Sequence, residues 1–303
     1  MSAGPLDRLW GARRGIERYV VKNAASAMRL GALDLVGRVV VVTGGSSGIG
    51  LATARRCLGE GARVVIVARR LDELEQARAE LSRSGEIHVR QCDVTDEHAV
   101  RSMMADIEES VGPIDVLVNN AGRSIRRSTV NAADRMHDYR RTMDVNYFGA
   151  VACTLAVLPG MIERRRGRIV NVSSIATQAL GPRFGAYAAS KAALDAFGEV
   201  LAGEVAGRGV TVTSVKMPLT RTPMIEPTGA YRKASSISAG QAATLVMRGI
   251  KYGRPRVSTL VGEAATVGTT VVPGSMALWR QVDYLAVPES AAARGGRGPS
   301  ERS

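Results

Sequence analysis

The chain is poor in aromatic residues and in cysteine. Phe, Trp and Tyr make up 4% of its 303 residues, and the three cysteines, Cys57, Cys92 and Cys153, are too few and too scattered for a disulfide framework or a metal site. The basic residues are spread along the chain without the interleaved aromatic residues of a nucleic-acid platform. We therefore expect reduced, buried thiols, no metal and no nucleic-acid partner.

Long apolar runs and signal sequences are missing as well. No window reaches about 18 uninterrupted apolar residues, the length of a membrane span. The start of the chain carries arginines and lacks the apolar region of a signal peptide. With 45% hydrophobic residues, the composition is that of a globular enzyme. The sequence therefore predicts a cytoplasmic protein.

Lysine is scarce although the chain is strongly basic. Lys and Arg number 41 against 28 Asp and Glu, a formal charge of +13, but only five of the basic residues are lysines. Such an arginine bias is more typical of GC-rich coding than of one function. A basic surface nevertheless favours anionic ligands such as phosphorylated cofactors, coenzyme A esters or an acidic lipid surface.

Short apolar, β-branched runs alternate with longer helical stretches, which is typical of parallel strands joined by helical crossovers. Seven runs are predicted strands: Val39 to Val42, Val64 to Val67, Ile87 to Arg90, Val116 to Val118, Ile169 to Val172, Val210 to Val215 and Val257 to Val261. The sequence thus predicts an α/β fold: a Rossmann-type, doubly wound, seven-stranded parallel sheet in a single domain. Its ligand site should lie at the carboxyl ends of the strands.

Two extensions flank the predicted domain, which covers 36–262. In the first, 1–35, apolar residues recur every four positions from Ile16 to Met28 with basic residues on nearly the opposite face, which predicts an amphipathic helix. That helix either packs on protein or makes a peripheral contact with the inner face of the membrane. The second extension, 263–303, should end in a disordered tail rich in Gly, Arg and Ser.

A glycine-rich turn follows the first predicted strand directly: Thr43-Gly44-Gly45-Ser46-Ser47-Gly48-Ile49-Gly50. Glycines permit a tight turn and let the backbone approach a pyrophosphate, and the helix that follows supplies free N–H groups and the positive end of its dipole. Because the turn lies between a β-branched run and a helix, it predicts dinucleotide binding by Gly44, Ser46, Ser47, Gly48, Ile49 and Gly50.

The second predicted strand ends at Ala68-Arg69-Arg70, where an NAD-specific site would place an acidic residue against the ribose 2′-hydroxyl. Arg69 can instead meet a 2′-phosphate with a charge-assisted hydrogen bond and stack on the adenine. The sequence therefore predicts NADP(H) as the cofactor, bound in part by Arg69 and Arg70.

A tyrosine and a lysine, Tyr187 and Lys191, lie four residues apart and so share one face of a helix, and Ser174 precedes them just past a strand. A tyrosine is a poor acid or base at neutral pH unless its phenolate is stabilised, and an ammonium group four residues along would provide that stabilisation. The spacing therefore predicts that Lys191 lowers the pKa of Tyr187.

With the glycine turn, Asn119-Asn120-Ala121-Gly122 and Asn146, this set resembles the short-chain dehydrogenase/reductases over roughly 36–262. The resemblance implies that Tyr187 supplies a proton, Ser174 bonds the substrate oxygen, Lys191 also holds the nicotinamide ribose and Asn146 positions a relay water. It also implies assembly as a homodimer or homotetramer through the helices around 145–158 and 187–201. The remaining implied cofactor contacts are Asp93 near the adenine, Asn120 beside the adenosine ribose, and Thr220 and Thr222.

Three further stretches, 119–127, 144–151 and 217–225, resemble the bacterial fatty acyl-coenzyme A reductases that make long-chain aldehydes, and Pro218-Leu219 replaces the Pro-Gly of most short-chain reductases there. This closer resemblance implies reduction of a fatty acyl thioester. Residues 217–238 and 271–285 would then line an acyl channel. The basic residues available there for coenzyme A phosphates are Arg221, Arg232 and Lys233.

Two other functions stay open. A ketone or 3-ketoacyl reductase would use the same four catalytic residues and release a secondary alcohol instead of a thiol and an aldehyde. A catalytically silent nucleotide-binding scaffold at a membrane would keep the fold, but such a protein would be free to lose Asn146, Ser174, Tyr187 and Lys191, which are all present.

Overall fold

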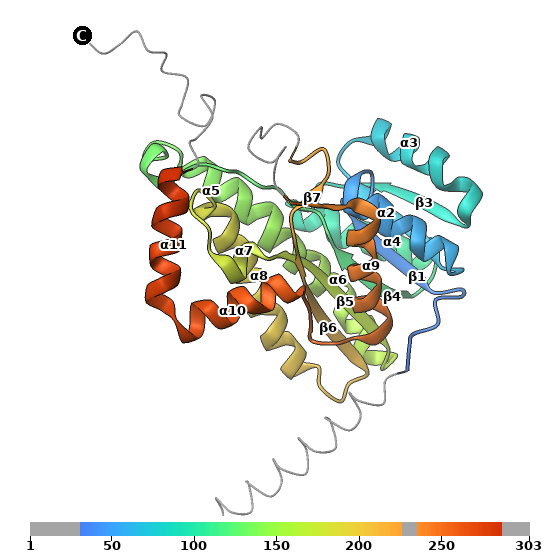
Figure 1. Ribbon diagram of the computed structural model, residues 1–303. Helices are drawn as coiled ribbons and strands as arrows, with labels where there is room; N and C mark the ends of the chain where they lie inside the picture. Colours follow the sequence, from blue (N-terminus) through green and yellow to red (C-terminus); the bar gives the residue numbers. More distant parts are fainter. Residues whose placement is uncertain (1–30, 226–234, 287–303) are drawn as a thin grey trace, which may run out of the picture.

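The computed structural model describes residues 31–225 and 235–286, which form a doubly wound α/β fold around one large sheet (Figure 1). The predicted seven-stranded parallel sheet is confirmed, in the order β3-β2-β1-β4-β5-β6-β9, and every neighbouring pair is parallel. Its strands are β1 (Val39–Thr43), β2 (Arg63–Ala68), β3 (Ile87–Gln91), β4 (Ile114–Asn119), β5 (Gly167–Ser174), β6 (Val210–Met217) and β9 (Arg256–Val257).

The last predicted strand is wrong at its end. Strand β9 contains only Arg256 and Val257, and Leu260 and Val261 open helix α10 (Leu260–Val271). The helix starts here because the Thr259 side chain accepts a hydrogen bond from the Gly262 N–H at 3.2 Å and so caps its first turn. Two further strands, β7 (Thr220–Arg221) and β8 (Ile237–Ser238), pair with each other and were not predicted, because two residues show no periodicity.

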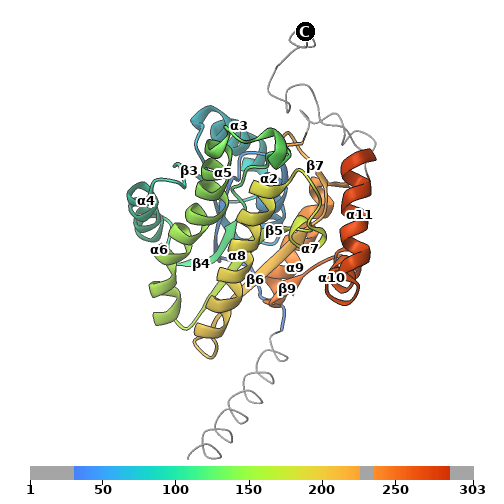
Figure 2. The same cartoon turned by 90° about the vertical axis from the view of Figure 1, so that its left-hand side faces the viewer.

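Helices cover both faces of the sheet (Figure 2). One buried cluster joins the sheet to α2, α3 and α9, and the other joins it to α4, α6 and α8. The five residues of β1 are all buried, as expected for the centre of such a sheet. The helices are α2 (Gly48–Gly59), α3 (Leu71–Leu81), α4 (Glu97–Ser110), α5 (Met136–Met143), α6 (Gly149–Glu163), α7 (Ala176–Ala179), α8 (Gly185–Glu204), α9 (Ala239–Tyr252), α10 and α11 (Pro273–Ala286).

A π-helical turn, η3 (Asp144–Phe148), joins α5 and α6 into one helix from Met136 to Glu163. Among the described residues this is the one helix long and apolar enough to cross a membrane by length and composition. In this fold it packs on the sheet, where Cys153, Val157 and Met161 are almost fully buried. Core helices of soluble proteins can have the same length and apolar composition, so this helix is weak evidence for a membrane span.

The C-terminal extension is helical at its start. The predicted boundary at 262 falls inside the first turn of α10, and α11 follows it. Both helices present polar groups to the domain: Gln178 of α7 donates to the Thr266 hydroxyl at 2.8 Å, and Arg280 donates to the Ala179 carbonyl at 3.3 Å. Their outer faces are apolar, with Leu260 91% and Leu285 81% exposed.

Several predictions from the sequence concern residues outside the described part of the chain. They are the amphipathic helix, which falls almost entirely in 1–30, the disordered tail at 295–303, and Arg232 and Lys233 of the substrate loop. Within the described part, the last residues of the first extension contact the domain, because Leu33 donates its N–H to the Lys251 carbonyl at 2.8 Å and Leu35 is 1% exposed.

We propose 36–262 as the catalytic domain, with an extension at each end.

Candidate active site

The carboxyl end of β5 and the first turns of α8 bring three of the predicted catalytic side chains together. Ser174 ends β5, and Tyr187 and Lys191 lie one turn apart on α8. Tyr187 is hydrogen-bonded to Ser174. The Ser174 hydroxyl also accepts a hydrogen bond from the Ala176 N–H at 3.1 Å, which fixes its position at the start of α7. A hydroxyl pair of this kind can donate two hydrogen bonds to one substrate oxygen.

Asn146, the fourth predicted residue, is fully buried in the π-helical turn η3. Its side chain accepts a hydrogen bond from the Arg123 N–H at 2.7 Å and donates to the Arg123 carbonyl at 2.9 Å. It also donates to the Ser190 hydroxyl at 2.9 Å, which in turn donates to the Tyr187 carbonyl at 2.8 Å. The side chain therefore joins the loop after β4 to the helix that carries Tyr187. Turns of this π type are frequent at functional sites.

Lys191 is buried, at 4% exposure, and donates from its Nζ to the Val172 carbonyl at 2.8 Å. Burial lowers the pKa of Lys191 to about 8, against an opposing effect of the Asp195 charge. Gly122 keeps the space beside the amine open. A Cβ at position 122 would lie 3.5 Å from the Lys191 Nζ and 3.2 Å from the Asn146 Oδ1. The structure thus holds an ammonium group that sheds its proton unusually easily.

The predicted lowering of the Tyr187 pKa by Lys191 is wrong. Burial raises the pKa of Tyr187, the hydrogen bond with Ser174 lowers it in part, and the negative charge of Asp195 raises it further. The physical reason is that the lysine amine is bonded to the Val172 carbonyl, so burial of the phenol dominates.

The glycine turn between β1 and α2 has the geometry that a bound pyrophosphate requires. Gly44 and Gly48 have φ angles of +63° and +55°, a region that favours glycine. A Cβ on Gly50 would lie 2.2 Å from the Gly44 carbonyl oxygen. The Ser47 side chain forms no hydrogen bond with the first turn of α2, so the N–H groups there face the turn unpaired by a cap. The residues present therefore fit a dinucleotide phosphate.

Two ion pairs lie at the end of β2, beside this turn. Arg69, at the end of β2, lies 3.6 Å from the Asp93 carboxylate, and Arg70 pairs with Glu73. Burial alone would raise the pKa of Asp93, but hydrogen bonds from Thr95 and the Arg69 charge outweigh it and lower that pKa. The structure therefore brings Arg69 and Asp93, both predicted to contact the cofactor, to one place.

The other predicted cofactor residues make different contacts, and two of them, Asn120 and Thr222, touch the turn. Asn120 donates to the Thr43 and Gly44 carbonyls at 2.9 and 3.0 Å, so it holds the glycine turn itself. Thr222 lies against Gly48, because a Cβ on that glycine would come 3.1 Å from the Thr222 Cγ2. Thr220 is buried and its hydroxyl donates to the Pro218 carbonyl at 2.9 Å. The Ser46 hydroxyl donates to Glu73 at 3.4 Å.

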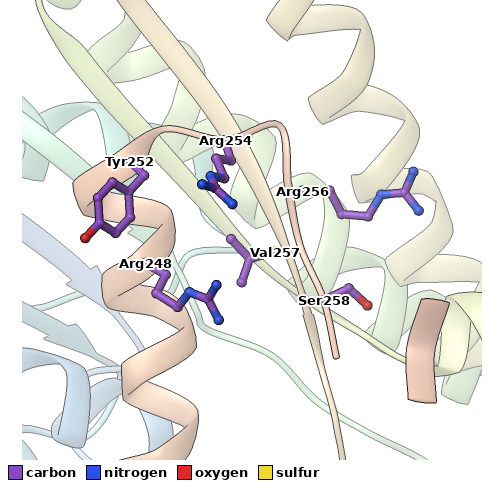
Figure 3. Close-up of a pocket in the computed structure, with 6 residues that line it drawn as sticks. All are labelled: Arg248, Tyr252, Arg254, Arg256, Val257 and Ser258. Carbon is purple, nitrogen blue, oxygen red and sulfur yellow. The ribbon is translucent and has the colours of Figure 1, made fainter. Parts of the chain in front are cut away.

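A separate hollow lies at the edge of the sheet. The cavity has a volume of about 500 Å³ and lies between α9 and β9. Figure 3 shows the residues that line it, which are Arg248, Tyr252, Arg254, Arg256, Val257 and Ser258. Arg256 is directed to the other side of β9 in that view and lies 3.7 Å from Glu263. None of the predicted catalytic residues lines the hollow, so the hollow is separate from the candidate active site.

Sequence reasoning missed two charged residues beside the site, Asp195 and Lys216. Both are buried and they form an ion pair. The spacing of Asp195, four residues after Lys191 on α8, is the one signal that could have indicated it. The three cysteines are buried as predicted, and burial raises the pKa of Cys57 and of Cys153 to about 12, each.

A doubly wound parallel sheet, a glycine turn at a helix N-terminus and a Ser–Tyr–Lys cluster at the strand ends define the class of Rossmann-fold oxidoreductases. The profile of the short chain dehydrogenase family matches residues 38–233. The chain therefore belongs to the short-chain dehydrogenase/reductase family, whose members use NAD(H) or NADP(H).

Three similar proteins illustrate the range of this family. The chain is 43% identical over 263 residues to a fatty acyl-CoA reductase of Acinetobacter baylyi, covering 86% of this chain and 89% of that one. It is 36% identical over 244 residues to a fatty acyl-CoA reductase of Mycobacterium tuberculosis, covering 80% and 83%. A crystal structure of an actinorhodin polyketide ketoreductase variant with NADPH has a TM-score of 0.67 and 30% identity, covering 74% and 95%.

Proposed function

We propose that this protein is an NADPH-dependent reductase that converts a fatty acyl thioester to the aldehyde and the free thiol. The observation that carries this proposal is the similarity to the Acinetobacter baylyi fatty acyl-CoA reductase, which covers most of both chains and all four proposed catalytic residues. The Pro218-Leu219 sequence, where most of the family has Pro-Gly, resembles the fatty acyl-coenzyme A reductases and supports the same proposal.

The proposed cofactor supplies a hydride when bound, and the residues that fit it are those of the glycine turn, Arg69 and Lys191. Ser174 and Tyr187 would donate hydrogen bonds to the carbonyl oxygen as negative charge develops on it, and Tyr187 would transfer its proton to that oxygen. Hydride addition to the thioester carbon gives a tetrahedral hemithioacetal. Breakage of its C–S bond releases the thiol and leaves the aldehyde, so the reaction consumes one hydride and one proton.

We propose that Lys191 restores the proton that Tyr187 gives up. The Tyr187 phenol is buried and bonded to Ser174, although the residue as a whole is partly exposed, and Lys191 lies one turn further along α8 with a pKa of about 8. An amine with this pKa can return a proton to the tyrosine near neutral pH. The Asn146 side chain fixes the helix that carries both groups, through Ser190.

The test is to follow NADPH oxidation with palmitoyl-coenzyme A while free thiol is assayed in the same cuvette. Thiol release that matches NADPH loss, and that is absent in Tyr187→Phe, supports the proposal. Stable NADPH with the thioester, together with turnover of 3-ketoacyl thioesters or ketones, favours the second candidate, a ketone reductase. The likeness to the polyketide ketoreductase supports that candidate, and the catalytic residues are the same in both.

We further propose that the chain is cytoplasmic and assembles as a homodimer or homotetramer through the faces of α6 and α8. Phe148, directly before α6, Leu155 of α6 and Val200 of α8 are exposed, at 56%, 57% and 62%. A peripheral membrane contact through 1–35 is proposed from the amphipathic pattern of that segment. Liposome flotation of the full chain and of a variant without residues 1–30 tests this contact. If neither form floats with the liposomes, the membrane contact is rejected.

A further inference from the structure

A buried ion pair lies behind the candidate active site. Lys216, on β6, is 7% exposed, and its Nζ is bonded to the Asp195 Oδ2 and donates to the Thr177 hydroxyl at 3.1 Å. Neither Lys216 nor Asp195 takes part in the proposed reaction. Burying two charges costs free energy even when they are paired, so a pair in this position calls for an explanation.

On one side, Lys216 holds the turn that carries Ser174. The Thr177 hydroxyl donates to the Ser174 carbonyl at 2.9 Å, so one chain of hydrogen bonds runs from the lysine to the serine backbone. The next residue on β6, Met217, accepts a hydrogen bond from the Ile175 N–H at 2.9 Å. Two successive residues of β6 therefore anchor the turn after β5.

On the other side, Lys216 holds helix α8. Asp195 lies one turn after Lys191 and two turns after Tyr187, on the same face of this helix. Its second carboxylate oxygen, Oδ1, is buried and has no hydrogen-bond partner in the described part of the chain. Lys216 is thus the cation bonded to a carboxylate that shares a helix face with both titratable groups of the site.

Asp195 is also the charge that acts on these groups. Its negative charge raises the pKa of Tyr187 and of Lys191. The other elements packed on α8 bring charges that do not act on the two groups in this way: Asp138 of α5 is bonded to Arg135, Asp144 lies in η3, and Arg168 of β5 is bonded to Thr211. Among the described residues, Asp195 is therefore the charge that acts on both groups, and Lys216 is the cation bonded to it.

We propose that Lys216 is a positioning residue of this site, which neutralises Asp195 behind Tyr187 and Lys191 and fixes the turn that carries Ser174. The effect of Lys216 on catalysis rests on the proposed function. Loss of the lysine leaves an unneutralised carboxylate on the face of α8, and loss of the carboxylate leaves an unneutralised ammonium group. The two losses must therefore shift the titration of the site in opposite directions.

The experiment compares the full-length protein with Lys216→Met, Asp195→Asn, the double variant and Lys216→Arg, from pH 6 to 10. One measurement is kcat for thioester reduction, and the second is the Kd of NADPH from its fluorescence, which requires no turnover. We expect the alkaline limb of both profiles to move up by about one pH unit in Lys216→Met and down by about one in Asp195→Asn. The double variant and Lys216→Arg should return close to the wild-type limb.

In addition, kcat at pH 7 should fall about threefold to tenfold in Lys216→Met while KM changes by less than about twofold. Lys251→Met is the matched control, because it removes a lysine from an ion pair with Glu60 that lies outside the site, and it should shift neither limb. If Lys216→Met fails to fold, Asp195→Asn decides alone, since Asn is close to isosteric with Asp.

Unchanged alkaline limbs in folded Lys216→Met or folded Asp195→Asn overturn the inference, as does a shift of both variants in the same direction. A purely structural pair would lower the melting temperature and leave the limbs in place. If no thiol is released by the wild type but the NADPH limbs shift as expected, the proposed function fails and the role of Lys216 stands.

Discussion

The glycine at position 50 should be irreplaceable for cofactor binding although it lies inside a helix. A Cβ at this position would lie 2.2 Å from the Gly44 carbonyl oxygen and 2.6 Å from the Asn120 Nδ2. Neither neighbour is the end of a flexible chain, because the first is backbone and Asn120 is held by bonds to the Thr43 and Gly44 carbonyls. Gly50→Ala must therefore move the turn away from α2.

The magnitude follows from two opposing effects. Alanine in a helix interior is normally more favourable than glycine by about 1 kcal/mol. Overpacking of a rigid site costs about 1–3 kcal/mol, so the net change in stability should be a loss of about 0–2 kcal/mol. Because the turn that opens is the one expected to hold the pyrophosphate, the Kd of NADPH should rise at least about tenfold, or about 1.4 kcal/mol.

Gly59→Ala is the matched control, since it lies in the same helix and a Cβ there meets nothing within 4 Å. NADPH fluorescence titration gives the Kd, and thermal unfolding gives the stability of each variant. Gly59→Ala should bind NADPH as the wild type does and be no less stable. If folded Gly50→Ala binds NADPH with the wild-type Kd, the dinucleotide assignment of this turn is refuted.

Three further predictions follow from the site and its surroundings. Arg69→Asp, which places a carboxylate at the end of β2, should shift the ratio of KM values for NADPH and NADH toward NADH, and an unchanged ratio rejects the 2′-phosphate assignment. Lys191→Met should abolish turnover. It should also raise the free energy of unfolding at pH 7 by up to about 3 kcal/mol, because the pKa of Lys191 is about 8 in the folded protein and 10.5 in the unfolded chain. Below pH 8 the folded protein therefore carries the full cost of the buried ammonium group. The unfolded state holds that proton up to pH 10.5, so the gain, measured by urea unfolding at each pH, must shrink between pH 8 and 10.5, and a gain that is constant with pH contradicts the shift. Leu155→Arg with Val200→Arg should turn the proposed oligomer into monomers on size-exclusion chromatography with light scattering, whereas Val267→Arg on α10 should not.

Periodicity was sufficient to predict most of the sheet. The apolar runs of β1, β2 and β4 are continuous because both faces of a central parallel strand are buried, and that burial also makes them recognisable. Strand β9 is different, since only Val257 of its two residues is buried. The apolar residues after it belong to a helix that is capped by Thr259. A short apolar run alone does not distinguish a strand from the start of such a helix.

The extension after β9 shows a second limit of pattern reasoning. A helix that covers a domain is expected to turn its apolar stripe inward. In α10 the inward residues are Gly262 and Thr266, while Leu260 and Val267 face outward. The contacts that place this helix are hydrogen bonds to Gln178, and such contacts between segments 80 or more residues apart leave no periodic signal.

The same reasoning explains why the proximity of the candidate catalytic residues could be predicted from the sequence, whereas the direction of their pKa shifts could not. Tyr187 and Lys191 are four residues apart, so their proximity is a local property of one helix. The direction of the Tyr187 pKa depends instead on where the lysine amine points, and its bond to the Val172 carbonyl comes from the strand beneath. Asp195 is local to the helix, but the cation that pairs with it comes from β6, 21 residues away. A charge pattern read along one helix gives the groups that can titrate, and the sheet under that helix decides in which direction their pKa values move.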